Sequence, residues 1–241
     1  MNQLRLANNS LAALLIAVGI AIAGYFVGQT MYNSKVGINT AEVKGLAERR
    51  VEADQAHWKI GYTVSGSDEN AVADLYKQSE VNQAQVVELL LESGFAESEI
   101  APGVIEYSRR EYRDYNQKLV EEKFLLVGSI EVETTKVRLV ATARAKMNEL
   151  ISRGIDIRNN APSYYFTKLN EIKPEMLKEA TKNARVAANE FAANAGVQVG
   201  GIRNARQGGF GIRDVGESYG ATAKIEKDVR VVTTITFSLT E

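Results

Sequence analysis

The longest apolar stretch of the chain lies close to its N-terminus. No charged side chain occurs between Leu6 and Ser34, and residues 11–32 (LAALLIAVGIAIAGYFVGQTMY) are almost wholly apolar. A helix that rises about 1.5 Å per residue would, at this length, match the roughly 30 Å hydrocarbon core of a bilayer. The pattern predicts a transmembrane helix over residues 11–32, with a short segment 1–10 before it and a polar linker 33–40 after it.

Charges at the ends of this helix predict its orientation. Arg5 keeps the N-terminus in the cytoplasm by the positive-inside tendency, although Lys35 beyond the helix weakens the bias. The alternative is a cleaved signal peptide, because Ala21–Ala23 is an Ala-x-Ala site. Cleavage near Ala23 would leave the apolar residues 25–27 at a new N-terminus, which favours an uncleaved signal anchor. We expect a single-pass inner-membrane protein with its body in the periplasm; the cleaved alternative is a soluble periplasmic protein.

Beyond residue 40 the pattern alternates between strand and helix signals. A period of two, or runs of β-branched and aromatic residues, predicts strands at 51–65, 104–115, 119–133, 164–170, 197–205 and 229–239. Periods of three and four predict helices at 70–93, 136–153 and from Pro174, which fits a first helical turn, to Gly196. Hairpins between the helices indicate an α+β body with a mostly antiparallel sheet and about three helices on one face. The order of elements suggests two similar halves within a domain of residues 41–241.

The same periodicity predicts which faces of two helices are buried. In the helix at 70–93 the predicted buried residues are Leu75, Ala84, Val87 and Leu91. In the helix that starts near Pro174 they are Leu177, Ala180, Ala184, Ala187, Phe191 and Ala195. Alanines along a helix face would let that helix lie close to a sheet.

Composition narrows the classes of function. The 241 residues carry 29 basic and 30 acidic side chains, and this near-neutral balance argues against nucleic acid as a partner. The chain has no cysteine and one histidine, His57. A disulfide framework and a thiolate site are therefore absent, and most zinc sites are excluded.

One candidate contact surface is the segment YSRREYRDY at residues 107–115, which interleaves arginines with tyrosines. On a strand, one face would carry Tyr107, Arg109, Arg113 and Tyr115, and the other Arg110 and Tyr112. A two-faced hairpin with cross-strand tyrosine and arginine contacts, or a subunit contact, explains this pattern better than a surface for stacking nucleic-acid bases.

A second candidate is the glycine-rich segment 200–214. Residues 200–205 continue a strand, and residues 207–214 are predicted to form a mobile loop that exposes Phe210 between Arg206 and Arg213. The segment lacks the glycine spacings of phosphate-binding and dinucleotide-binding loops, and no helix pattern follows it. We expect this loop to contact a neighbouring subunit or the envelope rather than a nucleotide.

No catalytic, metal-binding or cofactor-binding constellation emerges from the sequence. His57 and Trp58 would point to opposite faces of a strand, so a structural or surface histidine is favoured. A hydrolase that uses serine, aspartate and His57 is a minor alternative. The acidic residues Glu97, Glu99 and Glu121-Glu122 are assigned to solvation, because no spacing brings them together as an acid–base pair.

Three segments resemble the SIMPL-domain family, which includes YggE-like proteins and periplasmic immunogenic proteins. They are residues 41–60 (AEVKGLAERRVEADQAHWKI), residues 164–202, where a strand, an alanine-rich helix, a glycine and V-G-x-I follow one another, and the closing strand VRVVTTITFSL. The N-terminal span is similar to the membrane-anchored branch of that family. The resemblance implies an extracytoplasmic α+β protein, prone to self-association, with no established enzymatic chemistry.

These observations favour a non-enzymatic, membrane-anchored envelope protein that forms homo-oligomers, with a possible envelope or stress-related role. The alternative is an extracytoplasmic binding module for a small ligand, a peptide or an envelope polymer. It would use the hairpin at 107–115 or the glycine-rich loop, and its ligand is not identified. Neither hypothesis includes a cofactor, a metal or nucleic acid.

Overall fold

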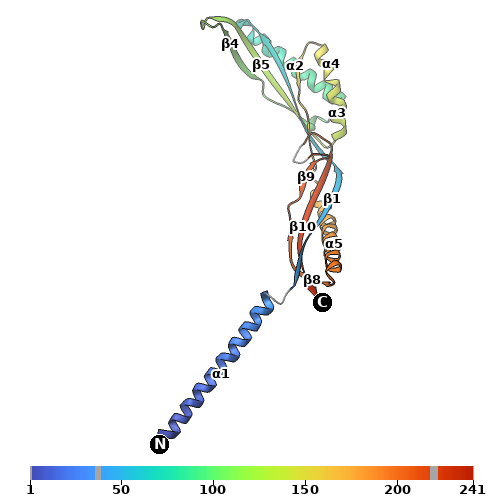
Figure 1. Cartoon of the computed structure of the whole chain (residues 1–241). Helices are drawn as coiled ribbons and strands as arrows, with labels where there is room; N and C mark the ends of the chain where they lie inside the picture. The colour runs from blue at the N-terminus through green and yellow to red at the C-terminus, as the bar shows by residue number, and fades with distance from the viewer. Residues whose placement is uncertain (1, 36–38, 218–221, 241) are drawn as a thin grey trace. The chain divides into compact units, whose positions relative to one another are not determined.

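The computed structural model describes residues 2–35, 39–217 and 222–240 (Figure 1). It confirms the α+β class, with antiparallel sheets and four helices in addition to an N-terminal apolar helix. The chain forms two compact units, which we treat separately. The first comprises Met1–Ala47, Leu177–Gly209 and Val231–Glu241, and the second Glu48–Met176 and Phe210–Arg230. Three elements contribute to both units: β1 (Thr40–Glu52), α5 (Leu169–Ala195) and β10 (Glu226–Thr240).

The N-terminal helix α1 (Asn2–Lys35) contains the whole predicted span. Its stretch Leu14–Ser34 is long and apolar enough to cross a membrane, and none of it is buried, although a signal sequence would have the same properties. The helix also extends over residues 33–35, which were predicted as linker. Ser34 Oγ donates to Met31 O at 3.1 Å, which satisfies a carbonyl in this last turn.

In the first unit, α5 lies on a sheet of β1, β10 and β8 (Gln198–Gln207), and β8 runs antiparallel to β10. The buried stripe of α5 in this unit is Ala180, Ala184, Ala188 and Ala192. Gly45 of β1 allows the close approach, because a Cβ there would lie 1.9 Å from the carbonyl oxygen of Ala180.

The predicted face of α5 is therefore only partly right. Ala180 and Ala184 are buried, but Ala187 and Ala195 are exposed, and 57% of Phe191 is accessible. A strip of methyl groups four residues apart allows the helix backbone to meet the sheet. A large side chain at the contact would hold the helix away from it.

The start of α5 also differs from the prediction. The strand expected at 164–170 is the short β7 (Ser163–Tyr165), and α5 begins at Leu169, so Pro174 lies inside the helix rather than in its first turn. Thr167 explains the early end of the strand. Its backbone N and its hydroxyl both donate to the carboxylate of Asp54, at 2.7 and 3.0 Å, which turns the chain away from the sheet.

The second unit is built on the central strand β2 (Gln55–Gly66), which pairs antiparallel with β5 (Leu119–Thr134) from Ala56 to Gly66. The strand predicted over 51–65 is split, because β1 ends at Glu52 and Ala53 donates its N–H to Ile225 O at 2.7 Å. β7 and β6 (Asp156–Asn159) pair with β2, and β3 (Ile100–Pro102) and β4 (Glu106–Arg113) pair with β5. β3 and β6 are too short for the pattern to predict.

Helices cover this second sheet. They are α2 (Val72–Glu92), preceded by a 3-10 turn at Glu69–Ala71, then α3 (Val137–Lys146) and α4 (Asn148–Ser152). The helix predicted over 136–153 is thus interrupted at Met147, which is fully buried. Gly94, Gly154 and Gly196 adopt positive φ angles of 103°, 86° and 70° where the helices end, a conformation in which glycine commonly stops a helix.

The buried face of α2 differs from the predicted one. It consists of Ser79, Asn82, Val86, Leu89 and Leu90. Ala84 and Leu91, which were predicted to be buried, are exposed. The pattern of apolar residues did not predict this face, because two of its buried residues, Ser79 and Asn82, are polar.

Candidate functional site

The clearest candidate contact surface is the far part of the β4–β5 hairpin, residues 104–123, which we call the hairpin arm. All eight residues of β4 are exposed, so neither face of this strand is covered. Among the described residues β4 pairs with β5 alone, and its other edge leaves main-chain groups unpaired. The connecting turn is ordered by Asp114, whose Oδ1 accepts from the backbone N of Asn116 and of Lys118, both at 2.9 Å. β4 and β5 are labelled in Figure 1.

Three of the five cations of the arm, Arg109, Arg113 and Lys123, are paired with carboxylates, whereas Arg110 and Lys118 have no such partner among the described residues. Arg109 donates to Glu122 across the strands, and Arg113 Nε donates to Glu111 at 3.0 Å. The hydrogen bond and the charge of Glu122 raise the pKa of Arg109, and Arg113 in the same way lowers the pKa of Glu111. The predicted cross-strand arginine contact is present, but its partner is a glutamate rather than a tyrosine.

The aromatic and aliphatic side chains of the arm remain uncovered. The exposed fractions run from 45% to 93% for Val104, Tyr107, Tyr112, Tyr115, Leu119 and Val120. Lys123 Nζ lies 5.6 Å from the centre of the Tyr112 ring. A cluster of exposed apolar residues beside an unpaired strand edge is typical of a protein–protein contact.

The glycine-rich segment is not the predicted loop. β8 continues to Gln207, and Gly211–Asp214 form the strand β9, which pairs antiparallel with residues 227–230 of β10. The predicted contact residues are divided between the units: Arg206 is an exposed residue of β8 in the first unit, whereas Phe210 and Arg213 belong to the second. Their role in a contact stays a prediction, but the loop predicted over residues 207–214 is wrong outside residues 208–210, which connect β8 to β9.

Within the second unit, Phe210 and Arg213 have their own partners. Phe210 is half-buried, with Lys173 Nζ 5.9 Å from its ring. Arg213 lies 3.4 Å from the carboxylate of Glu48, which also lies 3.6 Å from Arg230. These contacts hold both side chains against the sheet.

Asp214, at the end of the same segment, is a buried charge that the sequence reasoning missed. Burial raises its pKa, but the ammonium of Lys227 and the backbone N–H groups of Lys224 and Ala223 outweigh that effect, so its pKa is lowered. Asp214 was assigned to a loop, and the charged residues 226–228 concealed the first residues of β10. An isolated Asp-Lys pair at this spacing offers no signal that it is buried.

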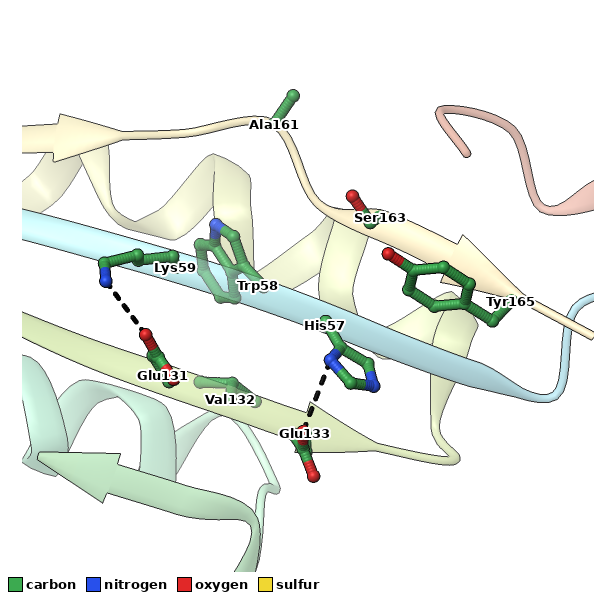
Figure 2. Close-up of a pocket in the computed structure, with 9 residues that line it drawn as sticks. All are labelled: His57, Trp58, Lys59, Glu131, Val132, Glu133, Ala161, Ser163 and Tyr165. Atoms are coloured by element: carbon green, nitrogen blue, oxygen red, sulfur yellow. Dashed lines mark hydrogen bonds and ion pairs between the residues drawn. The ribbon is translucent and has the colours of Figure 1, made fainter. Parts of the chain in front are cut away.

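The single histidine lies in a shallow pocket of about 250 Å³ on the outer face of the second sheet (Figure 2). His57 Nδ1 is 3.3 Å from Glu133 Oε1, and its ring meets that of Tyr165 edge-on at 5.1 Å. A second cross-strand pair, Lys59 with Glu131 at 2.9 Å, lies beside it. Trp58 is buried on the other side and donates to Asn160 O, which confirms that neighbouring residues His57 and Trp58 face opposite ways.

This pocket has the character of a solvated surface. His57 and Glu133 are 42% and 65% exposed, and both pairs compete with water. Ser163 Oγ accepts a hydrogen bond from Thr222 Oγ1 at 3.3 Å. Among the described residues, no hydrogen bond connects Ser163 to the imidazole of His57. The described residues also contain no group of three or more His, Asp or Glu side chains that could hold a metal ion. The geometry therefore agrees with a surface histidine.

One comparison relates the body to known proteins. The family model described as "SIMPL: Protein of unknown function (DUF541)" matches residues 41–237. This range includes the first two segments on which the resemblance was based and nearly all of the third. A search of curated proteins finds no match to the chain.

Proposed function

We propose that this chain, which belongs to the SIMPL family, is a non-enzymatic protein that is anchored in a membrane by α1 and forms homo-oligomers outside the cytoplasm. The anchor is supported by the apolar stretch Leu14–Ser34 and by Arg5 before it. The absence of a catalytic role is supported by the surface character of the His57 pocket.

The observation that carries the self-association is the exposed strand β4 of the hairpin arm. A strand edge with free N–H and C=O groups pairs readily with another strand, and two identical edges can pair around a two-fold axis. Such pairing would join the β4–β5 sheets of two copies and cover part of Tyr107 and Tyr112, which are 53% and 46% exposed. Because the arm carries five basic and five acidic side chains, two arms can approach without strong net repulsion.

Light scattering after size-exclusion chromatography of the full chain in a non-ionic detergent tests this proposal. We expect the protein mass to be a multiple of the 26.4 kDa chain mass. The double variant Tyr107→Lys/Tyr112→Lys places charges along the edge and should give monomers. Tyr76→Lys/Val81→Lys makes the same kind of change at exposed positions of α2 and should keep the wild-type mass.

The cysteine-free sequence allows a direct test of the strand contact. Single cysteines at positions 108, 110 and 112 of β4 should give a disulfide-linked dimer at one position, where the two-fold axis passes, and little at its neighbours. A wild-type chain that is strictly monomeric, or single-cysteine variants that cross-link equally at all three positions, would contradict the proposed pairing.

Anchoring and orientation are tested separately from assembly. The intact mass of the protein purified from membranes shows whether the chain retains α1 or has been cleaved near Ala23. A cysteine at position 115, where Tyr115 is 93% exposed, should react with a membrane-impermeant maleimide on spheroplasts before lysis. A label that appears only after lysis would place the body in the cytoplasm and overturn the proposal.

A further inference from the structure

The first unit contains an open groove that no part of the proposed assembly uses. It lies between α5 and β8, and the side chain of Phe237 on β10 forms its floor (Figure 1 labels the three elements). Its volume is about 480 Å³. We call it the basic groove and define it by Lys178, Lys182, Arg185, Val186, Ile202 and Phe237.

The three cations of the basic groove lie along one side of α5. Arg185 is fixed, because its guanidinium donates to Gly200 O at 2.9 Å and to Val199 O at 3.3 Å, and lies 5.1 Å from the Phe237 ring. Lys178 and Lys182 are one helical turn apart and exposed, and neither has an ion-pair partner among the described residues. No carboxylate lines the groove, so its electrostatic complement is an anion.

The remaining lining consists of Thr181, whose hydroxyl donates to Leu177 O at 2.8 Å, and of apolar side chains. Val186 and Ile202 are 50% and 53% exposed on the two walls, above the buried ring of Phe237. Exposed aliphatic residues beside lysines favour a ligand that carries both a negative head and a hydrocarbon chain.

Chain connectivity keeps this groove near the end of α1. Asn39 follows Lys35, the last residue of α1, by four positions, so their Cα atoms are at most about 14 Å apart. Asn39 O accepts from Leu239 N at 2.8 Å. Phe237 lies two residues before Leu239 in the same strand, a further distance of about 7 Å. The groove therefore lies within reach of the surface of a membrane that α1 spans.

We propose that the basic groove binds an anionic phospholipid of that membrane, with its phosphate at Lys178 and Lys182 and the start of an acyl chain along Val186, Ile202 and Phe237. The inference rests on the proposed anchoring by α1. Tethering supplies a high effective concentration of lipid, so a site of modest intrinsic affinity is occupied. Binding draws the first unit onto the lipid surface.

The test uses the full chain with Ile202→Cys, which carries the only thiol and takes an environment-sensitive NBD label. The protein is reconstituted at one chain per nanodisc, in phosphatidylcholine alone or in equal parts of phosphatidylcholine and phosphatidylglycerol, each with and without doxyl-labelled phosphatidylcholine. We expect brighter NBD emission in the doxyl-free anionic discs than in the doxyl-free neutral discs, and stronger quenching by doxyl lipid in the anionic discs.

A charge variant and a matched control give the decisive comparison. Lys178→Gln/Lys182→Gln should lower the ratio of docked to undocked protein in anionic discs roughly thirtyfold, if each lysine contributes as a basic residue near an anionic surface usually does. Lys77→Gln/Lys118→Gln removes the same charge from exposed sites of the second unit and should leave the quenching unchanged.

The outcomes separate this proposal from the proposed function. Equal quenching in both kinds of disc, or quenching that survives Lys178→Gln/Lys182→Gln, overturns lipid binding in the groove while the anchor stands. In discs loaded with two or more chains, NBD emission that rises above the one-chain value without doxyl quenching assigns the groove to a second copy of the chain, which also overturns lipid binding. A protein that fails to co-elute with nanodiscs contradicts the anchoring itself.

Discussion

Lys227 donates its ammonium group to the carboxylate of Asp214 inside the second unit, where the two side chains are 2% and 1% exposed. The other carboxylate oxygen accepts from the backbone N of Ala223 at 2.8 Å and of Lys224 at 2.9 Å. The pair therefore links β9, β10 and the chain that enters β10. Removal of one partner of a buried pair leaves an uncompensated charge, which is far more costly than the pair itself.

We expect Lys227→Met to lower the free energy of unfolding by about 3–5 kcal/mol. The double variant Asp214→Asn/Lys227→Met should lose less free energy of unfolding than Lys227→Met alone. The amide oxygen of the asparagine still accepts the backbone hydrogen bonds, and no charge is buried. Urea unfolding followed by the fluorescence of Trp58 measures this, since Trp58 is the single tryptophan and belongs to the core of the same unit.

Lys224→Met is the matched control for this pair. Lys224 forms an ion pair with Glu217 in which both side chains are about half exposed, so its loss should cost under about 1 kcal/mol. If Lys227→Met costs no more than Lys224→Met, the pair is not buried in solution.

The sequence was sufficient for much of the architecture, because its signals are local. Gly94, Gly154 and Gly196 end helices through positive φ angles, and the β4–β5 hairpin follows from two strand patterns around a polar turn. The α+β class depends on such signals alone, and so does the membrane-length helix.

The remaining features depend on long-range packing. The buried stripe of α5 follows from the contact of Ala180 and Ala184 with Gly45, more than 100 residues earlier in the sequence. In α2 the buried residues Ser79 and Asn82 look like surface residues in a hydrophobic pattern. For the candidate site, the tyrosine and arginine pattern located the hairpin, but the glutamates that neutralise it became visible only through the strand register.

Glu99 should make the second unit sensitive to acid. Burial raises its pKa, but hydrogen bonds from Lys136, Thr134 and the Ala96 backbone N–H outweigh burial and lower the pKa from 4.5 to about 2. A carboxyl with a lowered pKa stabilises the fold above its unfolded-state value, and this contribution is lost as the pH falls from about 4.5 towards 2.

We expect Glu99→Gln to reduce the free energy of unfolding at pH 7 by about 2 kcal/mol. At pH 3 the free energies of unfolding of the variant and of wild type should differ by less, because wild type has lost part of the contribution of Glu99. Unfolding followed by Trp58 fluorescence at the two pH values measures both effects. Glu97 is the exposed first residue of the 3-10 turn Glu97–Glu99 that ends at Glu99. Glu97→Gln is therefore the control and should behave as wild type. A constant gap between Glu99→Gln and wild type across this pH range would contradict the assignment.

The contact between α5 and β1 should not tolerate a methyl group at position 45. A Cβ on Gly45 would lie 1.9 Å from Ala180 O and 2.5 Å from Ala184 N, and neither backbone atom can move without moving the helix. We expect Gly45→Ala to cost about 3 kcal/mol. Hydrogen exchange of the α5 amides in the first unit should then accelerate roughly a hundredfold. Gly201→Ala, at a position of β8 with no atom within 4 Å of its Cβ, should leave these rates unchanged.

Tyr62 and Gly128 lie directly opposite each other on β2 and β5, and the tyrosine ring occupies the space above the glycine. A Cβ at position 128 would lie 2.0 Å from Tyr62 Cζ, and the fully buried ring has no open space into which it could move. Gly128→Ala should therefore cost about 3 kcal/mol in Trp58-monitored unfolding. Gly61→Ala, whose nearest contact is Arg158 Cβ at 3.4 Å, should cost under about 1 kcal/mol.

In a Tyr62→Leu background the ring is absent, so the additional cost of Gly128→Ala should fall to the level of Gly61→Ala, because the two sites are coupled. An unchanged cost in that background would show that the glycine serves the backbone rather than the tyrosine.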